Sequence, residues 1–327
     1  MVDYKKTRVL ITGGAGFIGS HLCDYFISKN IKEIICLDNL STGKKQNIIH
    51  LIGKENFKFI NGDIRDLSVC QSVCKNIDYV FHQAALGSVP RSLEDPYLTN
   101  DVNSTGFLNM LIASRDNNVS RFIFAASSST YGDSKSLPKI EEKIGSPLSP
   151  YALTKYINEL YAKIFFENYG LEYIGLRYFN VFGERQDSTS TYAAVIPNFA
   201  SKFMNNESPI INGDGSFSRD FTYVDNVIEM NILAMLSSDP NSINQIYNTA
   251  CGDRTSILEL ATIIKKQLSL IDINIKNIPI LFTKTRKGDI PHSLASIEKA
   301  KKLLNYSPKY RIENGLKKCL NWYKDNL

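Results

Sequence analysis

Short apolar runs alternate with longer helical patterns through the first half of the chain. The apolar runs predict strands at 8–12, 33–37, 57–61, 79–82, 121–126 and 172–178. The helical patterns lie between them, at 20–30, 67–75, 97–117 and 151–169. Strands that alternate with helices of this length predict an α/β fold with a doubly wound parallel sheet.

The alternation breaks after residue 178. Loops rich in Gly, Asn, Ser and Asp at 183–191 and 205–219 separate predicted helices at 196–205 and 226–236, and a strand at 245–249 rejoins the sheet. Further helices at 257–269, 296–304 and 312–324 complete a smaller lobe. We therefore predict a first domain at 1–180 with a return segment at about 220–250, and a smaller mixed α/β lobe at 181–219 and 251–327.

The first predicted strand runs into a glycine-rich turn that opens a helix, with glycine at positions 13, 14, 16 and 19. Such glycines let the backbone approach a pyrophosphate at a helix N-terminus, where free N–H groups and the helix dipole favour anions. The second strand stops at Asp38, where a carboxylate can accept ribose hydroxyls and would repel a 2'-phosphate. The pattern predicts a Rossmann-type NAD site rather than an NADP site. The alternative for Asp38 is an ordinary turn acid before Asn39.

The carboxyl ends of parallel strands meet at one edge of a sheet, and ligands bind there. The residues that fall at these ends are Gly13, Asp38, Asp63, Ala84 and Ser127. We expect them to line one site.

Composition narrows the possible partners. The 327 residues carry 38 basic and 33 acidic side chains, a net charge of +5, without long runs of either sign. This balance suits anionic small molecules better than nucleic acid. The six cysteines form no C-x-x-C pair and the four histidines are scattered, so we expect no metal site. With no apolar signal region and no run of membrane-spanning length, a reducing cytoplasm is expected and no membrane partner.

Tyr151 and Lys155 stand four apart where Ser149-Pro150 opens a predicted helix, so both side chains share one face. An ammonium beside a phenol favours the phenolate. A tyrosine needs its pKa lowered by about 3 units from ~10 to act as a base at neutral pH. One lysine is not enough, and an oxidised nicotinamide ring would add a second positive charge. The alternative is a surface tyrosine beside a solvated lysine.

With the glycine turn, Asp38, Asp63, Ser127 and Tyr151-x-x-x-Lys155 in this order, the sequence resembles the extended short-chain dehydrogenase/reductases. Within that family it is most similar to the UDP-N-acetylglucosamine 4-epimerases of bacterial polysaccharide pathways. The resemblance runs nearly end to end, and its most specific stretches are HQAALGSVPRS, AASSSTYGD, SPYALTKY, LRYFNVFGERQD, YAAVIP, RDFTYVDN and GDIPHSLA.

The resemblance implies a catalytic role for Ser127, Tyr151 and Lys155. Tyr151 would take the proton from the sugar O4 while C4 delivers hydride to NAD, and Ser127 would bridge to O4. Lys155 would hold the nicotinamide ribose and lower the Tyr151 pKa. NAD would stay tightly bound and be regenerated in each cycle.

The resemblance also implies two sets of binding residues. The NAD contacts would be Gly13, Gly16, Phe17, Ile18, Gly19, Asp38, Asn39, Ser41, Thr42, Gly43, Asp63, Ile64, Gln83, Ala84, Ala85, Asn103, Tyr151, Lys155 and Tyr178. The contacts to the UDP-sugar, in the smaller lobe and around the sugar, would be Gly87, Ser88, Ser127, Ser128, Ser129, Asn180, Gln186, Ala194, Val195, Arg219, Arg286, Asp289 and Ser293. Arg219 and Arg286 would hold the diphosphate, since a planar fork suits phosphate oxygens. The alternatives are surface ion pairs for the arginines and turn chemistry for the serine cluster.

Pocket size indicates the substrate. Ser293 stands where relatives confined to unacetylated hexoses carry tyrosine, and Gly87 where they carry lysine. Two small residues leave room for an acetamido group, unless they only suit local packing. The expected reaction interconverts UDP-N-acetylglucosamine (UDP-GlcNAc) and UDP-N-acetylgalactosamine (UDP-GalNAc) through a 4-keto intermediate, with UDP-glucose and UDP-galactose as further candidates.

Other reactions compete with this prediction. A uronate 4-epimerase, acting on UDP-N-acetylglucosaminuronate or UDP-glucuronate, would use the same triad. A decarboxylase or dehydratase is the nearest rival, but dehydratases carry an Asp-Glu pair where Ser128 and Ser129 stand. A catalytically silent NAD-binding regulator would be free to lose Tyr151 or Lys155, and both are present.

The helices predicted at 97–117 and 151–169 are apolar around much of their circumference. A helix that covers a sheet with one side and is apolar on the other packs against something further. We expect a homodimer face there, and burial under the smaller lobe is the alternative.

Overall fold

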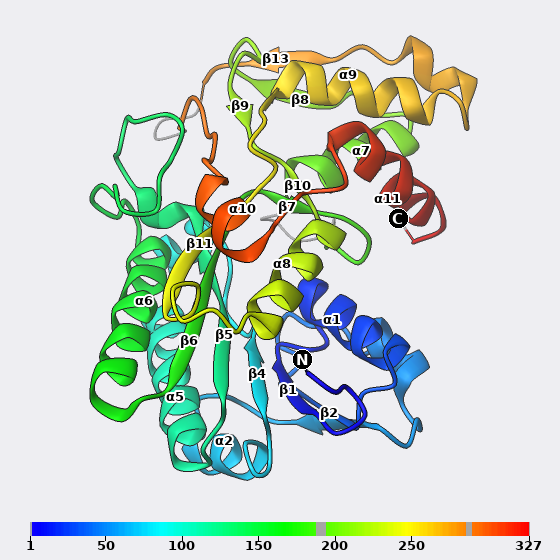
Figure 1. The fold of residues 1–327 in the computed structure, drawn as a ribbon. Helices are drawn as coiled ribbons and strands as arrows, with labels where there is room; N and C mark the ends of the chain where they lie inside the picture. The colour runs from blue at the N-terminus through cyan, green and yellow to red at the C-terminus, as the bar shows by residue number, and fades with distance from the viewer. Residues whose placement is uncertain (1, 188–193, 286–289, 327) are drawn as a thin grey trace.

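The computed structural model describes residues 2–187, 194–285 and 290–326. A parallel seven-stranded sheet forms its centre, in the order β11-β6-β5-β4-β1-β2-β3 (Figure 1). Its strands are β1 (Arg8–Thr12), β2 (Glu33–Asp38), β3 (Phe57–Asn61), β4 (Tyr79–His82), β5 (Arg121–Ser127), β6 (Glu172–Tyr178) and β11 (Gln245–Thr249). The predicted doubly wound α/β fold is confirmed. The chain moves outward from β1 to β3 and then resumes at β4 on the other side, so the strand order reverses beside β1, which is where such sheets bind ligands.

Helices cover both faces of the sheet. One face carries α2 (Leu67–Val73), α4 (Pro96–Asn100), α5 (Gly106–Asp116) and α6 (Pro150–Tyr169), and the other carries α1 (Phe17–Ser28) and α8 (Val224–Leu236). Side chains alternate along a strand, so Val9 and Ile11 pack toward α1 while Leu10 packs in the separate cluster under α2, α5 and α6. The sheet is buried from both sides, which explains the nearly continuous apolar runs.

The helix expected at 97–117 is present but not regular. A π-helical turn, η2 (Asp101–Thr105), separates α4 from α5. Turns of this kind occur at functional sites in helices. No sequence signal marked it, because its composition is compatible with an ordinary helix.

The smaller lobe holds α7 (Val195–Met204), α9 (Ile257–Leu268), α10 (Glu298–Leu304) and α11 (Ile312–Asn326). Short strands pair within or beside it, namely β7 (Val181–Phe182) with β10 (Thr222–Tyr223), β8 (Ile210–Asn212) with β13 (Leu281–Thr283), and β9 (Ser218–Arg219) with β12 (Thr255–Ser256). The remaining short helices are α3 (Val89–Glu94), η1 (Lys45–Leu51), η3 (Ser128–Tyr131) and η4 (Ile273–Asn277). Strands of two or three residues are too short to leave a periodic pattern, so sequence reading missed them. The predicted domain boundaries stay a prediction.

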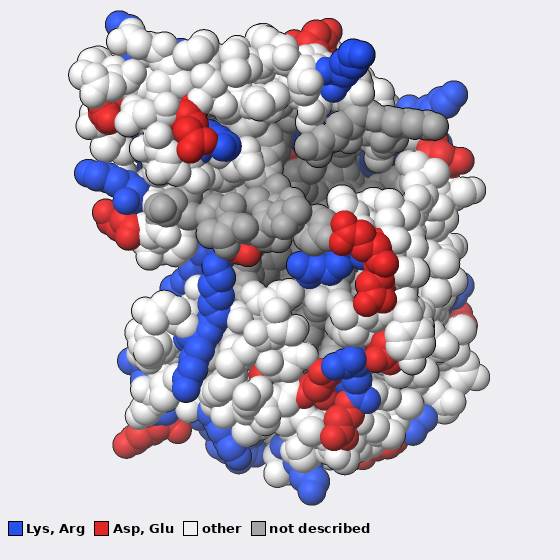
Figure 2. All heavy atoms as spheres, turned by 180° about the vertical axis from the view of Figure 1, so that it is seen from behind, with Lys and Arg blue, Asp and Glu red and all other residues white. Residues whose placement is uncertain are grey.

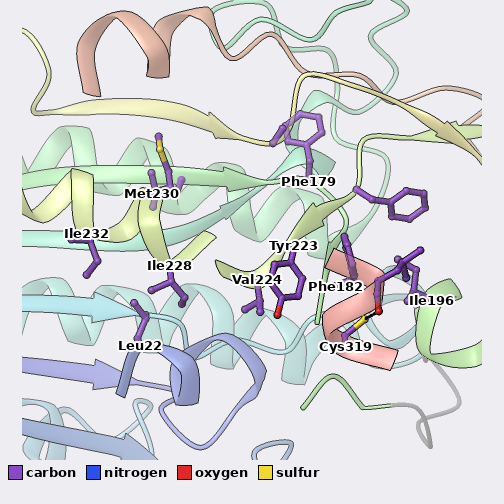
Figure 3. Packing of buried hydrophobic residues seen from close by; sticks show 14 of the residues in the cluster. Leu22, Phe179, Phe182, Ile196, Tyr223, Val224, Ile228, Met230, Ile232 and Cys319 are labelled. Atoms are coloured by element: carbon purple, nitrogen blue, oxygen red, sulfur yellow. Dashed lines mark hydrogen bonds between the residues drawn. The ribbon is translucent and has the colours of Figure 1, made fainter. Parts of the chain in front are cut away.

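One continuous cluster of buried residues joins the sheet to the smaller lobe. Figure 3 shows Val224 and Ile228 of α8 between Leu22 of α1 and a group that includes Phe182 and Tyr223. Helix α8 therefore contributes to both cores, so the lobe and the sheet are packed as one body.

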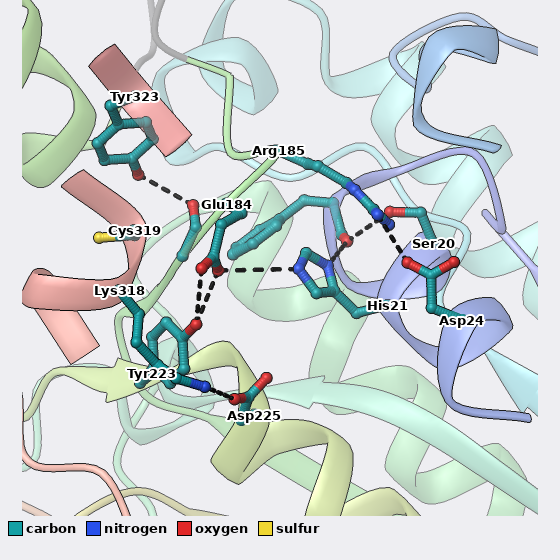
Figure 4. A network of polar contacts seen from close by, with 12 residues as sticks. Ser20, His21, Asp24, Glu184, Arg185, Tyr223, Asp225, Lys318, Cys319 and Tyr323 are labelled. Carbon is teal, nitrogen blue, oxygen red and sulfur yellow. Dashed lines mark hydrogen bonds and ion pairs between the residues drawn. The ribbon is translucent and has the colours of Figure 1, made fainter. Parts of the chain in front are cut away.

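Polar contacts reinforce this connection around the loop that follows β7 (Figure 4). The Tyr223 hydroxyl lies 2.8 Å from both carboxylate oxygens of Glu184, and Arg185 contacts Asp24 of α1 at 2.6 Å. On the other side, the Tyr323 hydroxyl of α11 donates to the carbonyl of Gly183 at 3.0 Å. The loop thus links the helix that opens at the glycine turn to the last helix of the chain.

Charged side chains of both signs are interspersed over the face drawn in Figure 2. Several are paired at the surface, such as Lys44 with Asp187 at 3.0 Å and Lys299 with Glu142 at 3.0 Å. All six cysteines are buried with free thiols. Of the helices that the structure describes, none is long and apolar enough to cross a membrane.

Candidate active site

A cavity opens where the carboxyl ends of β1, β2, β4 and β5 meet. The predicted NAD contacts that line it are Gly13, Gly16, Phe17, Ile18, Gly19, Asp38, Asn39, Ser41, Thr42, Asp63, Ile64, Gln83, Ala84, Ala85, Tyr151, Lys155 and Tyr178. Two of the predicted sugar contacts, Gly87 and Ser127, line the same cavity. The structure therefore brings the cofactor set and the catalytic residues together at one place.

The glycine turn fits tightly between β1, β4 and α1. Gly13 has φ +66°, and a Cβ added there would lie 2.7 Å from the backbone nitrogen of Ala84. A Cβ on Gly19 would lie 2.2 Å from the carbonyl oxygen of Gly13. Helix α1 begins at Phe17 with Gly16 as its N-cap and no side-chain cap, so its first N–H groups face the cavity end of the helix. This is a cradle for a pyrophosphate.

Asp38 is fixed at the end of β2 with 7% of its surface exposed. Its carboxylate accepts hydrogen bonds from the backbone N–H of Ala15 at 2.9 Å and of Leu40 at 2.8 Å. Burial raises the pKa of Asp38, and these backbone bonds partly oppose that rise. Gly43 does not line the cavity but packs on this carboxylate, where a Cβ would lie 2.7 Å from Oδ2. The arrangement suits an acid that accepts from ribose hydroxyls.

Asp63 lies at the next strand end and is held by its neighbours. Arg65 contacts it at 2.8 Å, and the side chain of Asn39 donates to it at 2.8 Å. The hydrogen bonds from Arg65 lower the pKa of Asp63 to about 2. Asp63 is therefore an anion at every ordinary pH, positioned to accept a hydrogen bond from a ligand in the cavity.

Tyr178, the last of the predicted NAD contacts along the chain, is a neutral side chain held by hydrogen bonds. The Tyr178 hydroxyl donates to Gln83 at 3.1 Å and accepts from the side chain of Asn231 at 2.9 Å. Burial raises the pKa of Tyr178 to about 12, so it remains a phenol. Asn231 belongs to α8 and lies 53 positions after Tyr178 in the chain. Sequence reasoning missed Asn231 because nothing near it in the chain marks a site.

The catalytic helix α6 begins as its sequence predicts. Ser149 caps the helix by accepting from the N–H of Ala152 at 3.1 Å, and Pro150 occupies the first helical position. This places Tyr151 in the first turn and Lys155 one turn later, both on the cavity side.

The ammonium of Lys155 is held by the backbone at the end of β5. It donates to the carbonyl oxygen of Ala125 at 2.7 Å, and burial lowers its pKa to about 8. Burial raises the pKa of Tyr151, and a hydrogen bond with the Ser127 side chain works in the opposite direction. Ser127 thus lowers the Tyr151 pKa, and the further lowering by Lys155 stays a prediction.

Ser129 orients Ser127. The Ser129 hydroxyl donates to the Ser127 hydroxyl oxygen at 2.8 Å, and the Ser129 backbone N–H approaches the same oxygen at 3.1 Å. With two donors directed at its oxygen, the Ser127 hydroxyl is free to donate its own proton to Tyr151. Ser128, the first residue of η3, stands between them.

Asn103 lies behind the cavity rather than in its lining. It sits in the π-helical turn. Its side-chain oxygen accepts from the N–H of Leu86 at 2.8 Å, and its side-chain nitrogen donates to the carbonyl of Leu86 at 3.1 Å. It also donates to the hydroxyl of Thr154 on α6 at 3.2 Å. Asn103 therefore fixes the backbone next to Gly87, and its predicted contact with the cofactor stays a prediction.

Most of the other predicted sugar contacts lie outside this lining. Ser88 caps α3 by accepting from the N–H of Arg91 at 3.3 Å. Asn180 donates to the carbonyl of Asp220 at 3.1 Å, and Gln186 donates to the carbonyl of Val181 at 2.9 Å.

Four further predicted sugar contacts lie in the smaller lobe: Ala194, Val195, Arg219 and Ser293. Arg219 donates to the carbonyls of Ser218 at 2.9 Å and Pro291 at 3.2 Å, and the N–H of Ser293 donates to Ser218 at 3.0 Å. Ala194 and Val195 open α7. Arg286 and Asp289 lie outside the described residues.

Sequence reasoning also missed part of the lining. The additional lining residues are Leu37, Gly62, Leu86, Val102, Ala125 and Ala126. They are apolar or lack side chains, and all but Leu86 and Val102 lie within two residues of a strand end. Adjacency to a strand end was the signal that could have found the others.

Comparisons with known proteins agree with this geometry. Residues 9–250 match the model of the NAD dependent epimerase/dehydratase family. A UDP-N-acetylglucosamine 4-epimerase from Methanobrevibacter ruminantium M1, solved in complex with UDP-N-acetylmuramic acid, is 40% identical, with a TM-score of 0.91 over 98% of this chain and 99% of that one.

Two further solved structures are similar along their whole length. A UDP-glucose 4-epimerase from Thermotoga maritima with UDP-glucose is 34% identical, with a TM-score of 0.89 over 98% of this chain and 99% of that one. A UDP-glucuronic acid 4-epimerase from Bacillus cereus, in complex with UDP-glucuronic acid and NAD, is 29% identical, with a TM-score of 0.89 over 98% of this chain and 100% of that one.

The chain belongs to the NAD dependent epimerase/dehydratase family. Within this family it is an NAD-dependent UDP-sugar 4-epimerase, and the predicted enzyme class and cofactor are confirmed. The glycine cradle and the fixed carboxylate of Asp38 are the features of this chain that fit NAD.

Proposed function

We propose that this UDP-sugar 4-epimerase interconverts UDP-GlcNAc and UDP-GalNAc. The observation that carries the proposal is the open space at Gly87, where an added Cβ meets no atom within 4 Å. Gly87 lines the cavity that also contains Ser127 and Tyr151. A lysine at this position would fill that space, whereas glycine leaves it for a substituent as large as an acetamido group. The relative from Methanobrevibacter ruminantium, a UDP-N-acetylglucosamine 4-epimerase, supports this reading.

Tyr151 is the proposed base that removes the proton from the sugar O4. A bound NAD would accept the hydride from C4. It would return the hydride to the opposite face of C4 once the 4-keto sugar has rotated in the site. Ser127 donates a hydrogen bond to Tyr151, which favours the phenolate. Lys155 is held by Ala125 at 2.7 Å beside the cofactor set and is proposed to contact the nicotinamide ribose.

Proton transfer to Tyr151 requires more than Ser127 supplies, because burial raises the pKa of the tyrosine. The remaining lowering needs a positive charge in the cavity. The Lys155 ammonium lines the same cavity as Tyr151, and a bound oxidised nicotinamide ring would add a second positive charge there.

The proposal is tested by offering the purified enzyme UDP-GlcNAc, UDP-glucose, UDP-glucuronate and UDP-GlcNAc uronate separately. The C4 epimer of each is quantified by proton NMR. We expect the acetylated hexosamine to have the highest kcat/KM. The similarity to the Thermotoga maritima and Bacillus cereus enzymes makes plain hexoses and uronates the competing substrates. A higher kcat/KM for a uronate would replace the proposal with a uronate 4-epimerase.

We also propose that two chains associate through α4, α5 and α6. On α6, Leu153, Leu160 and Ile164 are 44 to 49% exposed, and on α4 Tyr97 is 82% exposed. These side chains are exposed, which supports the proposal. The double variant Leu160→Asp and Ile164→Asp should run as a monomer in analytical ultracentrifugation, while Lys317→Asp, an exposed position on α11 of the smaller lobe, should not change the mass.

A further inference from the structure

Asp220 is completely buried, although it carries a carboxylate. Its Oδ1 accepts from the N–H of Cys251 at 2.9 Å, and its Oδ2 accepts from the N–H of Gly252 at 3.0 Å and of Ala295 at 3.3 Å. Burying a carboxylate is unfavourable unless such bonds compensate it. Burial nevertheless raises its pKa to about 7. The carboxylate thus joins the end of β11 to a segment more than forty positions later.

The neighbours of Asp220 extend this junction. The side chain of Asn180 donates to the backbone carbonyl of Asp220 at 3.1 Å. Ser218 lies alongside the later segment, because its N–H donates to Pro291 at 3.0 Å and its carbonyl accepts from Ser293 at 3.0 Å. Four separate stretches of chain therefore meet around Asp220, two of them through its carboxylate.

Three of these stretches carry residues assigned to the UDP-sugar in the proposed function. Asn180 follows β6, Arg219 precedes Asp220, and Ser293 lies two positions before Ala295. Arg219 also donates to the carbonyl of Pro291 at 3.2 Å, which draws it toward the segment of Ser293. Asp220 is not among the residues that line the described cofactor cavity.

We propose that Asp220 is a positioning residue of the UDP-sugar site: its carboxylate ties the stretch bearing Arg219 to the end of β11 and to the stretch bearing Ser293, while its backbone carbonyl accepts from Asn180. It contacts neither cofactor nor the reacting atoms. Strand pairing does not join Asp220 or Ser293 to the central sheet. The backbone N–H groups that donate to the buried carboxylate make this connection instead. The inference rests on the proposed sugar contacts and not on which sugar is preferred.

The test is Asp220→Asn, which conserves volume but replaces one acceptor oxygen with a donor, so at least one backbone N–H loses its partner. Binding of UDP alone is measured by calorimetry, with KM and kcat for whichever UDP-sugar the enzyme turns over best and the NAD content of the purified protein. We expect the UDP Kd and the KM to rise about tenfold or more, with kcat changed less than about threefold and NAD content unchanged.

Tyr247→Phe is the matched control. It removes a buried 2.6 Å hydrogen bond from Tyr247 of β11 to the carbonyl of Ser242. Asp220 bonds the chain just beyond the end of the same strand. It should lower stability without changing the UDP Kd. If Asp220→Asn behaves like this control, with a smaller folded fraction but wild-type Kd and KM, the proposal is overturned. Since UDP is common to every candidate substrate, that result is independent of which sugar the enzyme prefers.

Asp220→Glu provides a second reading if the asparagine variant does not fold. It keeps the charge and both acceptor oxygens but adds a methylene, which displaces the joined stretches. An intermediate rise of KM with retained kcat is expected. A KM equal to that of the wild type would contradict a positioning role.

Discussion

The two sides of the site are built in different ways. On the cofactor side, residues such as Gly13, Asp38 and Ser127 follow directly from strands of the central sheet and line one cavity. On the sugar side, Asn180 and Arg219 lie on loops or two-residue strands and are held by side-chain bonds to backbone carbonyls. In the proposed function, the sheet positions the catalytic residues, while a hydrogen-bonded network of loops positions the sugar contacts. Substitutions on the two sides should therefore fail in different ways.

The largest expected effect comes from Tyr151→Phe, which removes the proposed base. Epimerisation should fall by about a thousandfold or more, within the range of a lost general base. UDP binding, measured by calorimetry, should remain close to the wild type because the sugar side is untouched. Tyr156→Phe, on the same helix but outside the cavity lining, is the control. Substantial turnover by Tyr151→Phe would remove the proposed mechanism.

Gly19→Ala breaks the cofactor side alone. A Cβ would lie 2.2 Å from the carbonyl of Gly13, so the turn must open and lose its anion cradle. The wild-type protein should be purified with NAD already bound, and this variant should lose nearly all of it, as read by absorbance of the released nucleotide.

Gly53→Ala serves as the control for that glycine substitution. Its φ is +93° but an added Cβ meets nothing within 4 Å, so only local strain is added far from the cavity. The control should retain its NAD while losing some stability. Full NAD content in Gly19→Ala would show that the turn does not hold the pyrophosphate.

Ser293→Tyr tests the sugar side. A tyrosine there is expected to exclude the acetamido group, lowering kcat/KM for UDP-GlcNAc by about a hundredfold while sparing UDP-glucose. Ser293→Thr, a smaller increase in volume, should change the ratio far less. Unchanged turnover of UDP-GlcNAc by the tyrosine variant would disprove the pocket argument without affecting the mechanism.

The smallest expected effect is a pH dependence that arises on the cofactor side. Burial lowers the pKa of Lys155 to about 8, so its ammonium is present below pH 8 and is lost as the pH rises through that value. The kcat/KM should therefore fall at higher pH, approaching about tenfold per further pH unit for a single ionisation. Lys155→Arg stays charged and should lack this fall, whatever its absolute rate. The same fall in both proteins would assign the ionisation to another group.

The sequence predicted the cofactor side well because each part of it is local. A glycine turn, an acid at a strand end and a capped helix can be read from adjacent residues, and the structure puts Gly13, Asp38 and Tyr151 into one cavity. The apolar lining was not predicted, since Leu86 and Val102 resemble any core residues. Asn103 was assigned to the cofactor by resemblance alone, and the structure places it in the π-helical turn, outside the cavity lining.

The sugar side was predicted only by resemblance. Its geometry depends on contacts between distant positions, such as Asp220 with Ala295 and Ser218 with Pro291. Strands of two residues, like β9, carry no periodicity. Such pairings form because the tertiary structure brings the stretches together, and no single window of sequence contains that information.

The position of α8 and β11 determines the order in which the enzyme can mature on the ribosome. Strand β11 completes the sheet beside β6, and α8 covers the face on which Val9 and Ile11 are buried. A nascent chain ending near residue 180 therefore has a sheet face that only α1 covers and an open edge at β6, both of which favour aggregation. The nucleotide-binding half, although continuous in its chemistry, cannot finish folding until residue 249 has been synthesised.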